Sequence, residues 1–456
     1  EVFMTENLFL WNSASDFSRG TFENIVCVHD TLALEQADGC KVQAGCFTSE
    51  ETDAPPFGAL IASWNADTPP ATAVEVQVRV LVAETWSAWL SFGKWSPLIA
   101  RASAAPVTGE NGVSMDGDIV RITAPGGAHG FQLRVFLYTN HAEVSPTVRL
   151  LSAGIRPRQW LRELGEPIHR AVPVPAYSQI LRNPMLQQTL SGSIAITMLM
   201  NRQGEDLLPE EVAHSLWDAA AHSRGNRSFT AAVAGCYGYE CYVCYADLAG
   251  LKKELKNGYA CAICVNYACD AQTADAENLP LIAAASCTAK AHTLVVRGFE
   301  TRDDGTEYVL VNDSLADTDA AAQRRYLLRE VNAAWDGVAY FLHGKQYAPT
   351  LCPPMRICAS LQNGDVPSEW TLYIKGERTS LPLDYLMKNG VCTGTVCYAL
   401  RDEHAYATTA HKRFYYGNIS QNGNITLDTQ QMPAGTKMTV FIIGDAGRTI
   451  VAELKL

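Results

Sequence analysis

Four residues in the middle of the chain have the types and the order that nucleophilic acyl transfer requires. Gln179 lies in the segment VPAYSQ, Ser191 begins the run SGSIAITMLMNRQG, His292 opens AHTLVVRGFE, and Asp313 lies in VNDS. Acyl transfer needs a nucleophile, a base beside it, a group that orients the base and a donor for the oxyanion. The order Gln, Ser, His, Asp supplies each part once and predicts a catalytic constellation.

The elements expected around these residues are helix and strand ends. The run from Ser191 to Gly204 predicts a helix, whose first turn has unpaired backbone N–H groups and a dipole that favour negative charge. His292 opens a predicted strand, and Asp313 closes the next one, EYVLVND. A serine before a helix is also a good N-cap. Capping is therefore a second interpretation of Ser191.

The ordered motifs VPAYSQ, SGSIAITMLMNRQG, GNRSF, HTLVVRGFE and VNDS resemble a bacterial peptidase group. This group is related to the double-glycine leader peptidases of bacteriocin transporters, which are papain-like cysteine peptidases. The resemblance covers about residues 172–342. It implies that Gln179 is the oxyanion donor, that His292 is the base and that Asp313 orients the base.

Ser191 stands where that family carries its catalytic cysteine. A neighbouring imidazolium readily holds a thiol as thiolate, because the thiol pKa is only about 8.5. A serine must lose its proton during attack, so a papain-like site with serine is expected to lose most of its rate. Four interpretations stay open: an engineered replacement, a natural change that leaves a binding protein, a working serine nucleophile, or a likeness of fold alone in which Ser191 caps its helix.

The resemblance also implies a substrate cleft at the GNRSF motif. It assigns Gly225, Asn226 and Phe229 to substrate binding. Arg227 and Thr230 stand in this motif where relatives usually have Trp and Asn. Similarly, Ser314 follows Asp313 in VNDS where Pro is usual. The departures at Arg227 and Thr230 predict a cleft that differs from that of the relatives.

The predicted fold class is α+β, with a papain-like peptidase domain between two β-domains. Residues 1–156 are expected to form an N-terminal β-sandwich of jelly-roll type, which similar proteins also carry before the peptidase unit. The peptidase domain is expected over residues 157–348, where LPEEVAHSLWDAAAHS and ADLAGLKKELKNG predict helices and ACAICVNY predicts a strand. Residues 349–456 are expected to form a small C-terminal β-domain, because EWTLYIKG, RFYYGNIS, NGNITLD and MTVFIIGD are typical of strands and turns.

The strands of the N-terminal domain are predicted by alternation. VEVQVRVLV at 74–82 and GFQLRVFLYT at 130–139 alternate apolar and polar residues, the period of a half-buried strand. The same domain carries four tryptophans with two interpretations. Exposed indoles would stack on sugar or peptide, whereas buried indoles would belong to the core. The tryptophans are Trp64, Trp86, Trp89 and Trp95.

Fourteen cysteines raise the question of metals and disulfides. Cys241-x-x-Cys244 and Cys261-x-x-Cys264 have the spacing of a four-thiolate zinc site. Both pairs lie in β-rich runs, where positions i and i+3 point to opposite faces. Buried free thiols are therefore the favoured interpretation, and no metal or other cofactor is expected. The groups Cys27/Cys40/Cys46 and Cys392/Cys397 are candidates for disulfides.

The charge and hydropathy of the chain exclude some classes of binding partner. The net charge of −12 and the absence of a basic run exclude a phosphate-backbone ligand, so no nucleic acid is expected. No run of about 18 apolar residues predicts a membrane span. We expect a peptide or cell-wall-derived substrate, with a glycan as a candidate ligand of the N-terminal domain. The chain begins at Glu1 without an initiator Met, which is compatible with a removed leader and a secreted or cell-surface location.

A binding protein is the competing functional class. In that interpretation the β-domains contact a glycan, a cell-wall polymer or a protein, and the middle domain is a peptide groove without turnover.

Overall fold

The computed structural model describes residues 7–346, apart from 70, 98–100, 181–188, 206 and 208 and the side chains at 110, 210, 211 and 214. Beyond residue 346 it describes the backbone of strands β24–β31. The chain is mostly β-sheet with fewer helices. It divides into two compact units, residues 1–174, 216–312 and 324–350 in one and residues 175–215, 313–323 and 351–456 in the other. The three predicted domain boundaries stay a prediction.

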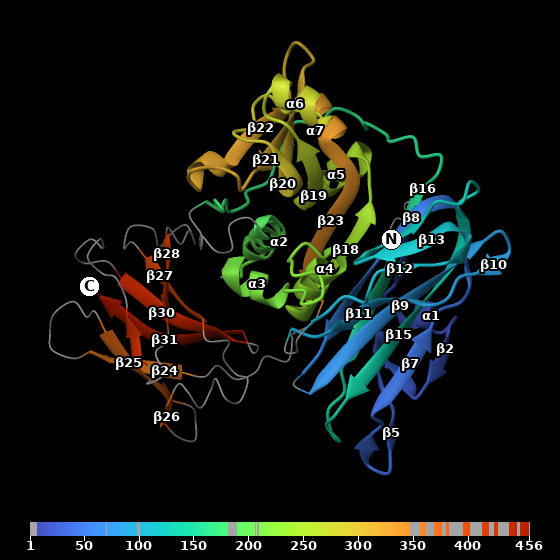
Figure 1. Cartoon of the computed structure of the whole chain (residues 1–456), viewed down its shortest axis with the longest axis horizontal. Coiled ribbons are helices and arrows are strands. Elements are labelled where there is room, and N and C mark those ends of the chain that lie inside the picture. The colour runs from blue at the N-terminus through green and yellow to red at the C-terminus, as the bar shows by residue number, and fades with distance from the viewer. Residues whose placement is uncertain are drawn as a thin grey trace. The chain divides into compact units, whose positions relative to one another are not determined.

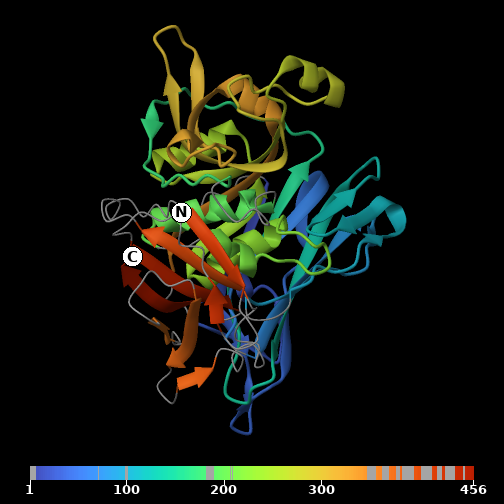
Figure 2. The same ribbon diagram turned by 60° about the vertical axis from the view of Figure 1, so that its left-hand side comes forward.

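The first unit opens with a 14-stranded sheet of antiparallel pairs, whose central order is β10-β9-β15-β8-β14-β13-β12. Strands β7, β15, β9 and β11 lie side by side in it (Figure 1), and Figure 2 shows the blue and teal strands of this sheet from a second direction. Its strands are β1 Leu8–Trp11, β2 Thr21–Glu23, β3 Ile25–Val28, β4 Thr31–Leu34, β7 Ala44–Thr48, β8 Thr52–Asp67, β9 Thr72–Val82, β10 Thr85–Trp86, β11 Leu90–Trp95, β12 Val107–Thr108, β13 Val113–Asp116, β14 Ile119–Ile122, β15 Ala128–Thr139 and β16 Thr147–Pro157. Strands β5 Gln36–Ala37 and β6 Cys40–Lys41 pair separately, and the one-turn helices are α1 Ala14–Phe17 and η1 Glu110–Gly112.

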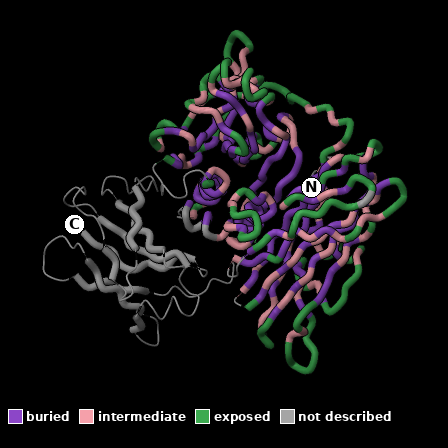
Figure 3. Tube along the Cα trace, in the orientation of Figure 1, coloured by how far each residue is buried: buried purple, intermediate pink, exposed green. Residues whose placement is uncertain are grey.

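The strands predicted at 74–82 and 130–139 are confirmed as β9 and β15. They pair antiparallel from Gly130 opposite Leu81 to Thr139 opposite Thr72. Along β9 every second residue is buried and its neighbours are half-buried, an alternation that is visible in Figure 3. The buried valines face the core because successive side chains of a strand point to opposite sides. The finer assignment of this sheet to a jelly roll stays a prediction.

The core interpretation of the tryptophans is confirmed for one pair, and stacking on sugar or peptide stays a prediction for the other. Trp64 and Trp95 are fully buried and belong to the core. Trp86 and Trp89 are half-buried. The guanidinium carbon of Arg79 lies 4.5 Å from the ring centroid of Trp86 and 5.1 Å from that of Trp89. The second pair therefore forms a cation–π stack outside the core.

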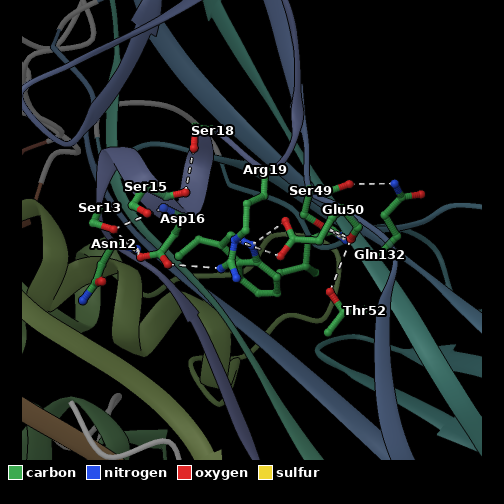
Figure 4. A network of polar contacts seen from close by, with 12 residues as sticks. Asn12, Ser13, Ser15, Asp16, Ser18, Arg19, Ser49, Glu50, Thr52 and Gln132 are labelled. Atoms are coloured by element: carbon green, nitrogen blue, oxygen red, sulfur yellow. Dashed lines mark hydrogen bonds and ion pairs between the residues drawn. The ribbon is translucent and has the colours of Figure 1, made fainter. Parts of the chain in front are cut away.

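Helix α1 is held to the sheet by polar side chains. The Ser13 hydroxyl accepts a hydrogen bond from the backbone N–H of Asp16 and donates one to its carboxylate at 2.6 Å. Arg19 connects the same carboxylate, at 3.1 Å, to Glu50 in the loop after β7, at 3.4 Å (Figure 4). A single turn has little helix stability of its own. The cap and the ion pairs therefore set the position of α1, which buries only Phe17.

The rest of the first unit is built on a seven-stranded sheet in the order β18-β23-β19-β20-β21-β22, with β17 paired to β20. The strands predicted at ACAICVNY, AHTLVVRGFE and EYVLVND are confirmed as β19, β20 and β21, and the helix predicted at ADLAGLKKELKNG is confirmed as α5. The sequence motifs did not predict α4 or β23. The strands are β17 Arg170–Ala171, β18 Tyr239–Tyr245, β19 Cys261–Tyr267, β20 Ala289–Thr301, β21 Glu307–Asn312, β22 Gln323–Leu327 and β23 Trp335–Lys345; the helices are α4 Arg227–Cys236, α5 Leu248–Lys256, α6 Ala271–Glu277 and α7 Leu328–Ala334.

Side chains of β8 complete the outer edge of β18, the strand at the end of this sheet. The Asn65 amide donates to the carbonyl of Cys241 at 2.7 Å and accepts from the N–H of the same residue at 3.0 Å. The Ser63 hydroxyl accepts from the N–H of Val243 at 3.1 Å. A Cβ on Gly154 of β16 would lie 2.7 Å from the Cα of Cys244, so the backbones approach closely here. The two sheets therefore share one buried junction.

Replacing Asn65 by Ala should destabilise the first unit by about 2–3 kcal/mol. The substitution leaves a buried N–H and a buried carbonyl of Cys241 without their partners, and each unsatisfied group is costly. Urea unfolding followed by tryptophan fluorescence measures the change. The exposed amide of Gln36, which donates to Gly39, is the matched control, and Gln36→Ala should change stability by under about 0.5 kcal/mol. Equal effects of the two substitutions would contradict a structural role for the junction.

His343 of β23 is held between two carboxylates. Its Nδ1 lies 2.9 Å from Oε1 of Glu240 in β18, and its Nε2 lies 2.9 Å from Oε2 of Glu254 in α5. The ring of Tyr259 packs against it with centroids 4.6 Å apart. Burial lowers the pKa of His343, but the hydrogen bonds and charges of the two glutamates outweigh it and raise the pKa to about 9. The protonated imidazole therefore joins β18, β23 and α5 at neutral pH.

The stability of the first unit should fall as the pH rises through about 9. The folded pKa of His343 lies above its unfolded value of about 6.5, so its contribution is complete below pH 6.5 and is lost as the imidazolium deprotonates. Free energies of unfolding measured from pH 6 to pH 9.5 should show this slope, by up to about 3 kcal/mol. His343→Gln should flatten it, while replacing the more exposed His129 by Gln should leave it unchanged. A slope that survives in His343→Gln would refute the assignment.

The second unit holds helices α2 Ser191–Arg202 and α3 Pro209–Ser215 and the turn η3 Ala320–Ala322. The predicted helix at 191–204 is confirmed, and the one predicted from Pro209 ends at Ser215. Strands β25, β28, β29 and β30 lie where the C-terminal motifs predicted them, in sheets ordered β24-β25-β26, with β29 beside β25, and β28-β27-β30-β31. The C-terminal strands are β24 Arg356–Leu361, β25 Glu369–Lys375, β26 Ser380–Pro382, β27 Thr395–Arg401, β28 Arg413–Asn418, β29 Asn424–Thr426, β30 Lys437–Gly444 and β31 Gly447–Lys455. That these strands form a separate small domain stays a prediction.

Candidate functional site

Ser191 is the first residue of helix α2 and is half-buried. The N-cap position belongs to Leu190, and no side chain caps it. The hydroxyl of Ser193 donates back to the carbonyl of Leu190 at 2.9 Å. Because Ser191 lies inside the first turn, no cap bond supports the interpretation of this residue as a helix cap. Its position places its backbone N–H among the unpaired donors of the helix start.

Helix α2 is buried almost all round, from Ser193 to Asn201, and its far end is tied to the VPAYSQ segment. The buried amide of Asn201 donates to the hydroxyl of Tyr177 at 2.9 Å and also to the carbonyl of Leu207. Its Oδ1 accepts from the N–H of Leu207. One asparagine therefore connects the helix that carries Ser191, the segment that carries Gln179 and the loop before α3.

The segment that carries Gln179 is joined to the loop after Asp313. The N–H of Gln179 donates to the carbonyl of Ser314 at 2.9 Å, and the Ser314 hydroxyl donates to Oε1 of Gln179 at 2.8 Å. Beside this pair, the Ser178 hydroxyl donates to the carbonyl of Ala316, and the Ser178 N–H donates to Asp319 at 2.6 Å. The structure thus brings together the loops of the predicted oxyanion donor and the predicted orienting carboxylate.

Asp313 is fully buried directly after strand β21. Its N–H donates to the carbonyl of Ala322 at 2.8 Å, and its Oδ1 accepts from the N–H of Leu315 at 2.9 Å. These bonds fold the chain back on itself immediately after the strand. The carboxylate therefore has a fixed place in the loop.

His292 lies in strand β20, opposite Val265 of β19, and only 3% of it is exposed. Its ring meets that of Tyr267 edge to face, with centroids 6.3 Å apart. This histidine belongs to the first unit, whereas Gln179, Ser191 and Asp313 belong to the second. The assembly of all four into one catalytic constellation stays a prediction.

The GNRSF motif forms the start of helix α4. Gly225 is exposed, and Asn226 is the N-cap, whose side chain accepts from the N–H of Phe229 at 3.0 Å. The Asn226 amide also donates to Asp218 at 3.3 Å. Phe229 is fully buried, with its ring centroid 6.3 Å from that of Trp64. Asn226 and Phe229 therefore have cap and core contacts, and the substrate contacts predicted for this motif stay a prediction.

Arg227, which departs from the family pattern, is half-buried and forms an ion pair with the buried Asp118 in the turn between β13 and β14. Its guanidinium lies 3.1 Å from Oδ1 of Asp118, and its backbone N–H donates to Oδ2. Burial raises the pKa of Asp118, and the charge and hydrogen bonds of Arg227 oppose that rise. The arginine thus compensates a carboxylate of the N-terminal sheet. Sequence motifs gave no signal for this pair, because 109 positions separate its members.

Removing only Arg227 should be strongly destabilising. Arg227→Met leaves a buried carboxylate without its counter-charge, which typically costs about 3–5 kcal/mol. The double variant Arg227→Met with Asp118→Asn should recover much of this loss, because no charge is then buried. The single variant should also be less destabilised near pH 4.5 than at pH 7, since a protonated Asp118 carries no charge. Chemical unfolding of the native chain, the two single variants and the double variant at both pH values measures these differences, and simple additivity would argue against the pair.

The cysteines do not gather into a metal site in the described part of the chain. There, no group of three or more His, Cys, Asp or Glu side chains is arranged to hold a metal ion. Cys241 and Cys244 lie on β18, Cys261 and Cys264 on β19, and β23 runs between the two strands. All four are buried free thiols, as predicted. Burial is the largest cause that raises the pKa of Cys264, to about 12.

The disulfide expectation is wrong for one group. Cys27, Cys40 and Cys46 are free thiols. Cys392 and the side chain of Cys397 lie outside the described residues. No helix among the described residues is both long and apolar enough to cross a membrane.

Two family models match the chain. Residues 7–155 match the Peptidase C39 N-terminal domain, and residues 172–340 match the Peptidase_C39 like family. Together they support a C39 papain-like peptidase family, a papain-like fold for the second segment and a peptidase-type function.

Other comparisons add little. No curated protein matches the chain. Among solved structures, the chain is similar to a lectin from Bauhinia forficata in complex with GalNAc, at 12% identity and a TM-score of 0.21, over 33% of this chain and 99% of the lectin. It is also similar to a structure of infectious bursal disease virus, Gt strain, at 11% identity and a TM-score of 0.18, over 30% of this chain and 32% of that one. Both likenesses are too weak to carry an argument about fold or function.

Proposed function

We propose that this chain, whose family matches support a C39 papain-like peptidase family, cleaves a peptide or related amide bond through an acyl-enzyme intermediate. The observation that carries the proposal is the family match over residues 172–340, which includes all four motif residues. A peptide is the substrate class that such a family suggests.

In the proposed mechanism Ser191 attacks the carbonyl carbon of the substrate while His292 takes the hydroxyl proton. Asp313 orients the imidazole and stabilises the imidazolium that forms. The oxyanion is bound by the Gln179 amide and by the backbone N–H of Ser191 at the start of α2. Collapse of the intermediate releases the amine, which takes the proton from His292, and water then hydrolyses the ester.

Two features support the roles of Gln179 and Ser191 in this scheme. The first-turn position of Ser191 supplies an unpaired N–H beside its own hydroxyl. The hydrogen bonds of Ser178 to Ala316 and of Ser314 to Gln179 hold the oxyanion donor on a fixed loop, and catalytic groups need such support to keep their geometry.

Binding without turnover is the second candidate, and the serine at position 191 favours it. A serine hydroxyl has a much higher pKa than a cysteine thiol, so a papain-like histidine cannot hold it as an anion before attack. In this alternative the middle domain is a peptide groove, and the N-terminal sheet contacts a glycan, a cell-wall polymer or a protein. The half-buried Trp86 and Trp89 are the residues to test for that contact.

Replacing Ser191 by Cys should raise amide turnover by roughly 10³-fold, because it supplies the nucleophile for which the family geometry is built. The measurement is release of a fluorescent amine from a set of peptide amides by the native and substituted chains. A peptide-linked electrophile should label the substituted chain at position 191. The native chain is the control for this labelling, because it has the same cysteines except the one introduced at position 191.

His292→Ala in the Ser191→Cys background is the matched control and should abolish both turnover and labelling. If that background neither turns over any amide nor reacts with the electrophile, the catalytic proposal is refuted. Saturable peptide binding to the native chain without turnover in either form would then favour the binding protein.

A further inference from the structure

Gln179 and Ser314 form a buried pair of residues that lie 135 positions apart. Only 7% of Gln179 and 2% of Ser314 is exposed. Two hydrogen bonds join them, from the Ser314 hydroxyl to Oε1 of Gln179 at 2.8 Å and from the Gln179 N–H to the Ser314 carbonyl at 2.9 Å. The second bond uses backbone atoms alone and is independent of the serine side chain. A substitution of Ser314 therefore removes only the first bond.

The orientation of a glutamine amide decides whether it can stabilise an oxyanion. One end of the amide is a carbonyl oxygen, which only accepts, and the other is an NH₂ group, which only donates. An oxyanion is stabilised by the donor end alone. A hydroxyl that donates to Oε1 holds the acceptor end of Gln179 toward Ser314 and turns the NH₂ end away from it.

The hydroxyl has a fixed position from which to do this. Ser178, the neighbour of Gln179, is fully buried and donates to the carbonyl of Ala316 and to the carboxylate of Asp319. The N–H of Asp313 is bonded to Ala322 at the other end of the same loop. Because Ser178 beside Gln179 is bonded to the loop that carries Ser314, the two residues cannot move apart without breaking several hydrogen bonds.

We infer that Ser314 is a positioning residue, which orients the Gln179 amide so that its NH₂ end serves as the oxyanion donor. This role rests on the proposed function. Ser314 acts through Gln179 and touches no reacting atom.

Kinetics in the Ser191→Cys background test the role. Ser314→Ala should lower kcat for a peptide amide about tenfold or more with little change in KM, because a misoriented donor is lost only in the transition state. In a Gln179→Ala background the same substitution should have no further effect on kcat, since the residue through which it acts is gone. An equal loss of kcat in both backgrounds would overturn the inference.

Thr197→Val is the matched control for loss of a buried hydroxyl. Thr197 belongs to the same unit, is fully buried and donates to the carbonyl of Ser193 at 2.6 Å. It should lower the melting temperature about as much as Ser314→Ala does, and should leave kcat unchanged. If Ser314→Ala and Thr197→Val both lower kcat in proportion to their loss of melting temperature, Ser314 has only a structural role.

A spectroscopic readout separates this inference from the proposed function. In the native chain with ¹⁵N-labelled glutamine, the side-chain signals of Gln179 are identified by their absence in Gln179→Ala. In Ser314→Ala they should shift and exchange with water faster, and in Thr197→Val they should not. If Ser191→Cys neither turns over an amide nor reacts with the electrophile, the proposed function fails, and the signals alone decide the orienting role. Signals unchanged by Ser314→Ala would overturn it.

Discussion

A strand edge whose polar groups are paired by side chains is the constraint on which the first unit depends. Strand β18 ends its sheet, and buried N–H and C=O groups on such an edge must find partners. Asn65 and Ser63 of β8 supply them, and helix α4 fits closely against β8 because a Cβ on Gly235 would meet the Cα of Asn65 at 2.7 Å. The peptidase-like sheet and the N-terminal sheet consequently share one compact unit.

Much of the strand structure could be predicted, because half-buried strands leave a clear alternation of residue types. Strands β9 and β15 are examples. Helix α4 escaped prediction because every residue from Ser228 to Gly235 is buried, so its sequence has no polar face to mark the helical period. Strand β23 lies between β18 and β19 and is likewise buried over most of its length, which removes the alternation. The sequence did not predict α4 or β23 because both are buried on more than one side.

The candidate site was predictable in its residue types and only partly in its contacts. The order of motifs placed Gln179 and Asp313 in the same scheme, and their loops are joined in the structure. The roles of Asn226 and Arg227 could not be inferred from a family motif, since one depends on where α4 begins and the other on Asp118, which is remote in sequence. Likewise, no spacing rule connects Ser314 to Gln179. Such contacts arise only when distant segments fold together.

The buried thiols have a practical consequence. Burial is the largest cause that raises the pKa of Cys241, Cys244, Cys261 and Cys264, so each is neutral at physiological pH. Alkylating reagents attack thiolates, and a neutral, enclosed sulfur reacts only when the surrounding structure opens. Cys241 lies at the junction beside Asn65. The rate at which an alkylating reagent modifies Cys241 therefore reports how often the two sheets separate there.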